Sequence, residues 1–281
     1  MSVEAVSENP PRIGVFDSGF GGLTVLRALV SRLPHAQYAF IGDTARLPYG
    51  SKSRRTIARY AVESAQFLVR EQGAEFLVIA CNTASALALD AIQQAVPVPV
   101  LGVIEPGASA ARAASETGDV LVIATDATVQ SHAYSAACQA KGLRSLEKAC
   151  PLLVPLVEEG WTNHPVTAEV IRIYLGELDA RAASEGLTPD TLVLGCTHYP
   201  LLRPLIGQEV RAGIRVIDSA EAAADAAMQM IGGRALSAPQ ANPTETEIHC
   251  FATDSVEKFE RLGSRFLGRP VGPVSLVDLD G

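Results

Sequence analysis

Short apolar runs alternate with amphipathic stretches along almost the whole chain, and this alternation limits the fold more than any other feature. In residues 54–72 the apolar positions Ile57, Tyr60, Ala61, Ala65 and Leu68 recur at spacings of three and four, which predicts a helix with one buried face. The runs predicted as buried strands, closely bounded by Gly, Pro or Asp, are 12–16, 37–41, 75–80, 98–103, 119–124, 143–148, 191–195, 214–217, 247–251 and 274–279. Such alternation predicts an α/β fold with three layers and mostly parallel sheets.

The two halves of the chain echo each other weakly. In the first half, one strand runs into a turn at Asp17 and a later strand ends in Cys81-Asn82-Thr83. In the second half, one strand runs into a turn at Thr125 and a later strand ends in Cys196-Thr197-His198. Ligands of open α/β sheets bind beyond the carboxyl ends of the strands, so two facing halves would share one cleft.

This echo predicts two pseudo-symmetric domains with an active-site cleft between them. We expect the first α/β domain to comprise residues 12–105 plus 218–281, because the last strands and helix are too few to form a domain alone. Residues 106–217 form the second domain, residues 1–11 a disordered tail, and residues 234–246 an exposed loop rich in Pro, Ser, Ala and Asn.

Charge and cysteine content narrow the class of protein. The chain has 23 basic and 31 acidic residues and a formal charge of −8, so a basic nucleic-acid-binding face is not expected. No apolar run approaches the roughly 18 residues of a membrane span, and the acidic first residues do not resemble a signal peptide. Five cysteines at scattered spacings favour reduced thiols, and we predict a cytoplasmic location.

Two loops carry candidate binding groups. The glycines of DSGFGG (17–22) leave the amides of a helix beginning near Leu23 open to an anion, although Asp17 could simply cap that helix. The motif is neither a dinucleotide fingerprint nor a P-loop, because the required last glycine and the Lys-Ser/Thr pair are absent. The rigid loop at Pro48 and Gly50 could point amides at a carboxylate, or Ser51 or Ser53 could merely cap the next helix.

The cysteines Cys81 and Cys196 are the strongest candidates for chemistry. A single cysteine after a buried strand is usually a small core residue, but these two close matched strands and each precedes hydrogen-bonding residues. A zinc site on Cys81, Cys196 and His198 is an alternative, which the lack of any CxxC or HExxH spacing disfavours. His198 could orient or protonate Cys196, whereas Glu158 lies in a segment that we predict to be a helix-poor linker.

The blocks DSGFGGLTVL, GDTARLPYG, ACNTAS and GCTHYPLL, in this order, resemble the glutamate racemases of the bacterial cell-wall pathway. The resemblance covers nearly the whole chain. It implies an enzyme without cofactor or metal that interconverts L- and D-glutamate and supplies D-glutamate for peptidoglycan synthesis. Members of the family are often dimers, so a homodimer is the expected assembly.

The resemblance also implies roles for individual residues. Inversion at the α-carbon needs a base on one face and an acid on the other, and a thiolate and a thiol suit this pair of roles. By analogy, Cys81 deprotonates D-glutamate with help from Asp17, and Cys196 deprotonates L-glutamate with help from His198. The residues implied in substrate binding are Asp17, Ser18, Pro48, Tyr49, Gly50, Asn82, Thr83, Thr125, Thr128, Glu158, Thr197 and His198.

Three other functions remain as alternatives. A two-cysteine relative could act on aspartate or a hydantoin, or be a decarboxylase or isomerase, although such relatives generally lack the DSGxGGLTV opening together with the PYG loop. A pyridoxal-phosphate racemase would need a Schiff-base lysine, and no lysine of the chain follows a strand with phosphate-binding residues beside it. An amino-acid-binding protein on this fold would not need both cysteines.

Overall fold

The structure is a computed structural model and describes residues 10–235 and 246–279. Most of the predicted tail (residues 1–9) and of the predicted loop (residues 236–245) lie outside the described residues.

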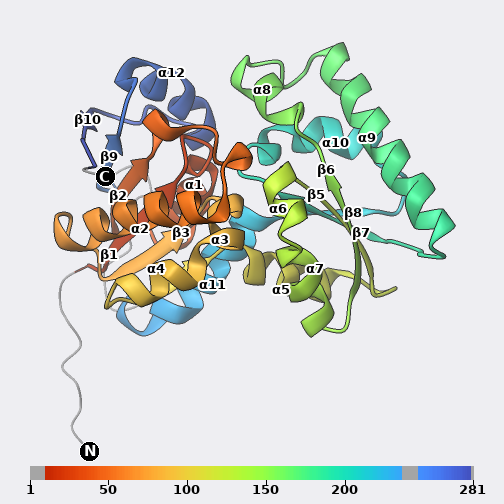
Figure 1. Ribbon diagram of the computed structural model, residues 1–281, viewed down its shortest axis with the longest axis horizontal. Helices are drawn as coiled ribbons and strands as arrows, with labels where there is room; N and C mark the ends of the chain where they lie inside the picture. The colour runs from red at the N-terminus through yellow and green to blue at the C-terminus, as the bar shows by residue number, and fades with distance from the viewer. Residues whose placement is uncertain (1–9, 236–245, 280–281) are drawn as a thin grey trace, which may run out of the picture.

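Two parallel sheets organise the chain (Figure 1). The first has six strands in the order β10-β9-β2-β1-β3-β4, namely β10 (Val274–Leu276), β9 (Ile248–Ala252), β2 (Gln37–Gly42), β1 (Arg12–Asp17), β3 (Phe76–Ile79) and β4 (Val100–Gly102). The second has four strands in the order β6-β5-β7-β8, namely β6 (Arg144–Ala149), β5 (Asp119–Ala124), β7 (Thr191–Gly195) and β8 (Arg215–Asp218).

Helices cover both faces of each sheet. On the first sheet, α1 (Leu23–Arg32), α11 (Ser219–Ala235) and α12 (Val256–Leu267) pack on one face, and α2 (Arg54–Arg70), α3 (Asn82–Leu87) and α4 (Leu89–Ala95) pack on the other. On the second sheet, α5 (Ile104–Ala114) and α7 (Ala133–Ala140) pack opposite α8 (Leu153–Glu158), α9 (Pro165–Ser184) and α10 (Arg203–Glu209). The short elements are α6 (Asp126–Gln130), η1 (Thr44–Arg46), η2 (Tyr49–Ser51) and η3 (Tyr199–Leu202).

The predicted α/β fold class is confirmed. Every predicted strand is present, with its ends shifted by at most a few residues, but β6, β8 and β10 are not buried throughout as predicted, because they lie at the edges of their sheets. The buried face of α2 is also as predicted, except that Tyr60 is only half-buried. The guanidinium groups of Arg46 and Arg59 lie over its ring. Ser53 caps α2 by accepting a hydrogen bond from the Thr56 N–H.

One prediction about local structure is wrong. Glu158 does not lie in a helix-poor linker but is the last residue of α8. Leu153 and Val157, four positions apart, are both buried and face the core. Pro155 does not prevent this helix because it stands in the first turn, where no intrahelical N–H bond is lost.

We propose the predicted division of the chain, residues 12–105 plus 218–281 against residues 106–217, as the domain organisation. The strand membership supports it, since β1–β4, β9 and β10 share one sheet and β5–β8 share the other. The blue C-terminal segment in Figure 1 accordingly lies in the same lobe as the red N-terminal one. One hydrophobic cluster includes residues of both sheets, so the two lobes are packed together. Among the described residues, no helix has the length and apolarity that crossing a membrane requires.

Candidate active site

Each sheet has one position where its strand order reverses. From β1 the chain moves to β2 on one side and then returns to β3 on the other side; from β5 it moves to β6 and returns to β7 in the same way. Connections leave such a pair of strands in opposite directions, which opens a crevice at their carboxyl ends. In the first sheet the residues at this crevice are Asp17 and Cys81, and in the second they are Thr125 and Cys196. The repeated topology thus explains the weak echo in the sequence.

Cys81 lies where β3 passes into α3. Its Sγ accepts a hydrogen bond from the Ala84 N–H at 3.4 Å and donates to Ser18 Oγ at 3.4 Å. Burial and the nearby negative charge of Asp17 raise the pKa of the Cys81 thiol to about 12. Near neutral pH, Cys81 is therefore a thiol that holds its proton.

Asp17 connects the two cysteine turns electrostatically. It is 2% exposed, and its Oδ2 accepts a hydrogen bond from the Gly19 N–H at 2.9 Å, whereas its Oδ1 has no hydrogen-bond partner among the described residues. Burial raises the pKa of Asp17, and the positive charge of His198 acts against that rise. The carboxyl group is thus within electrostatic range of both Cys81 and His198. The N-cap residue of α1 is Gly22.

His198 follows Cys196 and contacts Glu158. Its Nε2 lies 3.3 Å from Glu158 Oε1, and its Nδ1 lies 3.4 Å from Thr197 Oγ1. Burial alone would lower the pKa of His198, but its hydrogen bonds to Cys196 and Glu158 raise that pKa to about 10. In Glu158, burial is likewise outweighed by the His198 hydrogen bond together with the positive charges of His198 and Lys258, so the pKa of this carboxyl is lowered. The side chain next to Cys196 is therefore an imidazolium at neutral pH.

The two turns meet across the junction of the two sheets. Thr24 at the start of α1 donates its hydroxyl hydrogen bond to the carbonyl oxygen of Thr197 at 3.0 Å. The hydroxyl of Thr83, two residues after Cys81, lies 3.0 Å from the hydroxyl of Thr125 and 3.2 Å from that of Thr128. The Thr125 and Thr128 hydroxyls are themselves 2.9 Å apart. The chain therefore places three predicted binding residues in one hydroxyl cluster.

Gly21 is needed at this junction because no side chain fits there. A Cβ at Gly21 would lie 2.4 Å from Thr197 Oγ1 and 2.5 Å from His198 Nδ1. We expect Gly21→Ala to lower kcat by about 10²-fold, because a shift of about 1 Å in a reacting group costs roughly that much. Steady-state kinetics would measure it. The matched control is Gly176→Ala in α9, where a Cβ meets nothing within 4 Å; equal activity of the two variants would contradict the prediction.

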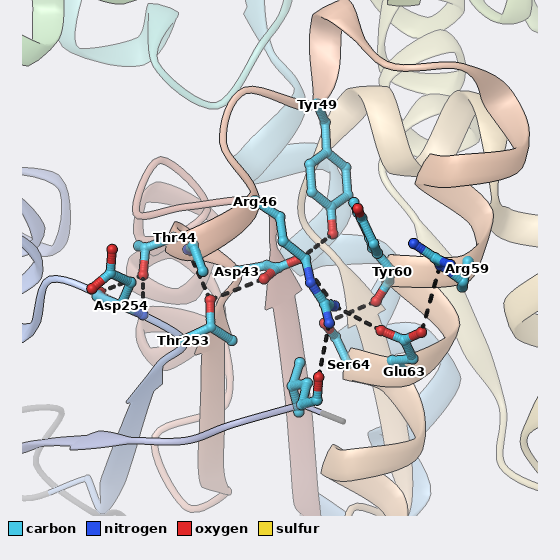
Figure 2. A network of polar contacts seen from close by, with 12 residues as sticks. Asp43, Thr44, Arg46, Tyr49, Arg59, Tyr60, Glu63, Ser64, Thr253 and Asp254 are labelled. Atoms are coloured by element: carbon cyan, nitrogen blue, oxygen red, sulfur yellow. Dashed lines mark hydrogen bonds and ion pairs between the residues drawn. The ribbon is translucent and has the colours of Figure 1, made fainter. Parts of the chain in front are cut away.

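The loop carrying Pro48, Tyr49 and Gly50 is anchored from below by buried polar residues (Figure 2). The buried Tyr49 phenol donates to Asp43 Oδ2 at 2.5 Å, and Asp43 Oδ1 accepts from the Thr253 hydroxyl at 2.9 Å. Burial raises the pKa of Asp43, while Tyr49 and Arg46 oppose the rise. The Tyr49 side chain points at Asp43 and not at a ligand. The backbone amides of the loop are therefore the groups with which we expect it to bind a ligand.

Arg46 ties the same loop to the end of the chain. Its Nη1 is 2.7 Å from Glu63 Oε2 in α2, and its Nη2 donates to the Leu279 carbonyl oxygen at 2.8 Å. On the other side, η2 contacts α6, which carries Thr128. The loop thus reaches the second lobe, while Pro48 is exposed and a Cβ at Gly50 meets nothing within 4 Å.

The sequence did not single out every residue that contributes to this region. Thr24, Tyr134 and the anchoring role of Asp43 were missed, because each has a partner far away in the sequence: Thr197, Asn82 and Thr253, respectively. Thr24 and Tyr134 reach their partners only because the two lobes pack together, and Thr253 reaches Asp43 through the pairing of β9 with β2. Among the described residues, no group of three or more His, Cys, Asp or Glu side chains is arranged to hold a metal ion.

Comparisons with known proteins agree with this geometry. The family model described as Asp/Glu/hydantoin racemase matches residues 13–227. The chain belongs to this family. It is therefore a racemase, that is, an isomerase.

Similar proteins include a glutamate racemase of Koribacter versatilis (strain Ellin345), which is 54% identical over 98% of this chain and 100% of its own length. The crystal structure of glutamate racemase isoform RacE1 from Bacillus anthracis has a TM-score of 0.85 at 36% identity and covers 96% of this chain and 98% of its own. A glutamate racemase from Francisella tularensis, solved in complex with D-glutamate, has a TM-score of 0.84 at 35% identity and covers 97% of this chain and 98% of its own.

Proposed function

We propose that this chain interconverts L- and D-glutamate by moving the α-proton between Cys81 and Cys196. The observation that carries the proposal is the placement of the two cysteines at matched switch points of two facing sheets, each beside a group that handles protons. The relatives named glutamate racemase support the substrate.

The charged groups around the two thiols differ. Cys81 holds its proton because burial and Asp17 disfavour its thiolate. His198, which is hydrogen-bonded to Cys196, carries a positive charge at neutral pH. For L-glutamate we assign Cys196 as the base and Cys81 as the acid, as the resemblance implies.

Proton transfer then proceeds without any redox change. The Cys196 thiolate takes the α-proton from one face of L-glutamate, and the Cys81 thiol gives its proton to the opposite face of the α-carbon. D-glutamate leaves an enzyme in which Cys81 is the thiolate and Cys196 the thiol, and the reverse reaction uses these roles. We assign Asp17 next to Cys81, and His198 with Glu158 next to Cys196, as the groups that assist proton transfer at the two thiols.

Binding of the amino acid uses the polar residues gathered around the two turns. We assign the amino and carboxylate groups of glutamate to Ser18, Asn82, Thr83, Thr197 and the amides of the Tyr49–Gly50 loop. Thr125, Thr128 and Glu158 line the same region from the second lobe. The carboxyl ends of parallel strands are the usual place for such a ligand.

The test is racemisation of glutamate by purified protein with no pyridoxal phosphate added. We expect the circular-dichroism signal of L-glutamate to decay to zero, and a coupled enzyme assay to detect D-glutamate. EDTA should leave the rate unchanged, and the protein should show no absorbance of bound pyridoxal phosphate, flavin or nicotinamide. Loss of activity with EDTA and recovery with zinc would contradict the metal-free mechanism, and faster racemisation of aspartate would overturn the substrate.

The remaining parts of the proposal concern the setting of the reaction. The D-glutamate would serve peptidoglycan synthesis in the cytoplasm, as the resemblance implies. We also propose a homodimer, which sedimentation at micromolar concentration would test.

A further inference from the structure

Tyr134 in α7 contacts both cysteine turns from a position that the proposed reaction does not use. Its phenol donates a hydrogen bond of 2.8 Å to Oδ1 of Asn82, the residue after Cys81. Its ring packs on the backbone before Cys196, where a Cβ at Gly195 would lie 2.9 Å from Cε2 of Tyr134. The side chain is fully buried, so one residue of the second lobe joins the two turns.

The amide of Asn82 is only half satisfied. Asn82 is 3% exposed, its Oδ1 is bonded to Tyr134, and its Nδ2 has no hydrogen-bond partner among the described residues. A buried donor without a partner costs stability and is retained in proteins mainly where a ligand or water completes it. Because the amide is planar, fixing Oδ1 on the phenol also fixes the direction in which Nδ2 points.

The phenol is suited to this task. Burial raises the pKa of Tyr134, so its hydroxyl group keeps its proton and remains a hydrogen-bond donor. The side chain of Ser219, at the start of α11, contacts the same phenol, and a Cβ at Gly107 would lie 3.2 Å from the phenol oxygen. Three elements, α5, α7 and α11, therefore hold the phenol oxygen in place.

We propose that Tyr134 is a positioning residue, which fixes the Asn82 amide so that Nδ2 donates to a carboxylate of the bound amino acid. This inference rests on the proposed function and adds a residue to it. Because the hydrogen bond crosses from the second lobe to the first, the donor is correctly aimed only when the two lobes are packed as in this structure.

A role through Asn82 makes a specific kinetic prediction. Tyr134→Phe should raise KM for both enantiomers by about tenfold and leave kcat within about twofold, since a carboxylate contact is present in the ground state and the transition state alike. Isothermal titration with D-glutamate should show the same loss in Kd. Asn82→Ala should raise KM further, because it removes the donor itself.

The double variant Tyr134→Phe/Asn82→Ala separates positioning from general packing. If Tyr134 acts through Asn82, the double variant binds D-glutamate as weakly as Asn82→Ala alone. The matched control is Tyr38→Phe, which removes a buried phenol hydrogen bond of 2.8 Å to the Leu33 carbonyl oxygen in the first lobe. This control should be destabilised to a similar extent in urea unfolding and keep the KM of the wild type.

The outcomes distinguish this inference from the proposed function. The positioning role would be overturned if Tyr134→Phe left KM unchanged, or if adding Tyr134→Phe to Asn82→Ala weakened D-glutamate binding by a further tenfold. Neither result would affect the proposed function as long as the wild type racemises glutamate. A wild-type protein that neither binds nor racemises glutamate would overturn the proposed function and this inference with it.

Discussion

Replacing Cys81 or Cys196 with alanine is expected to lower racemisation in both directions by at least about 10⁴-fold, the upper range for a general acid or base. Each variant keeps one thiol and the polar residues around it, so D-glutamate should still bind in isothermal titration. Both thiols are nearly inaccessible, at 6% and 5% exposure, and the lost side chain is small. Circular dichroism at the glutamate signal would give the rates.

Reactions that need only one of the two cysteines test whether the cysteines act on opposite sides of the α-carbon. Each variant should exchange the α-proton with deuterated solvent, or eliminate a β-leaving group from a substrate analogue, for one enantiomer only. Cys250→Ala is the matched control, because Cys250 is also a buried free thiol but lies in β9 at the far side of β2. Full racemisation by Cys81→Ala or Cys196→Ala would rule out the two-base mechanism.

Asp17→Asn and His198→Asn are expected to impair opposite directions of the reaction. Burial raises the pKa of Asp17 beside Cys81, so we assign Asp17 as the group that accepts the Cys81 proton, and its loss should lower kcat more for D-glutamate. His198 is bonded to Cys196, so its loss should lower kcat more for L-glutamate. Each decrease should be about 10²–10⁴-fold, as is typical of groups that assist proton transfer.

The measurement is the initial rate from each enantiomer, at several concentrations, for both variants. The equilibrium constant between enantiomers is one, so kcat/KM must fall equally in both directions, and any asymmetry appears as matched changes in kcat and KM. Equal losses of kcat for the two substrates in both variants would mean that Asp17 and His198 only hold the shape of their turns.

The sequence predicted the fold class and the strands because buried parallel strands have a strong local signature. Asp17, Cys81, Thr125 and Cys196 could be placed at strand ends in advance, since strand ends follow from hydrophobic runs and the residues that interrupt them. Their grouping at two switch points needed only the general behaviour of α/β sheets.

Other features depend on contacts that no local pattern encodes. The helix that ends at Glu158 was missed, and at six residues it is too short to show a sustained helical repeat. Tyr134 gave no signal, because its partner Asn82 is on another sheet's helix and only the packing of the two lobes joins them. The anchoring of Tyr49 by Asp43 likewise depends on Thr253, which reaches this loop only through the pairing of β9 with β2.

The strand order of the first sheet has a consequence for biosynthesis on the ribosome. β2 pairs with β1 on one side and with β9 on the other, and β9 is translated after the whole second sheet. The second sheet comes from one contiguous stretch and can close as soon as β8 has emerged, whereas the outer edge of β2 stays open until residue 252 is available. An open strand edge is a template for wrong pairing. The nascent chain is therefore most prone to aggregation between the synthesis of β2 and that of β9, and ribosome-bound chaperones would be most useful in that interval.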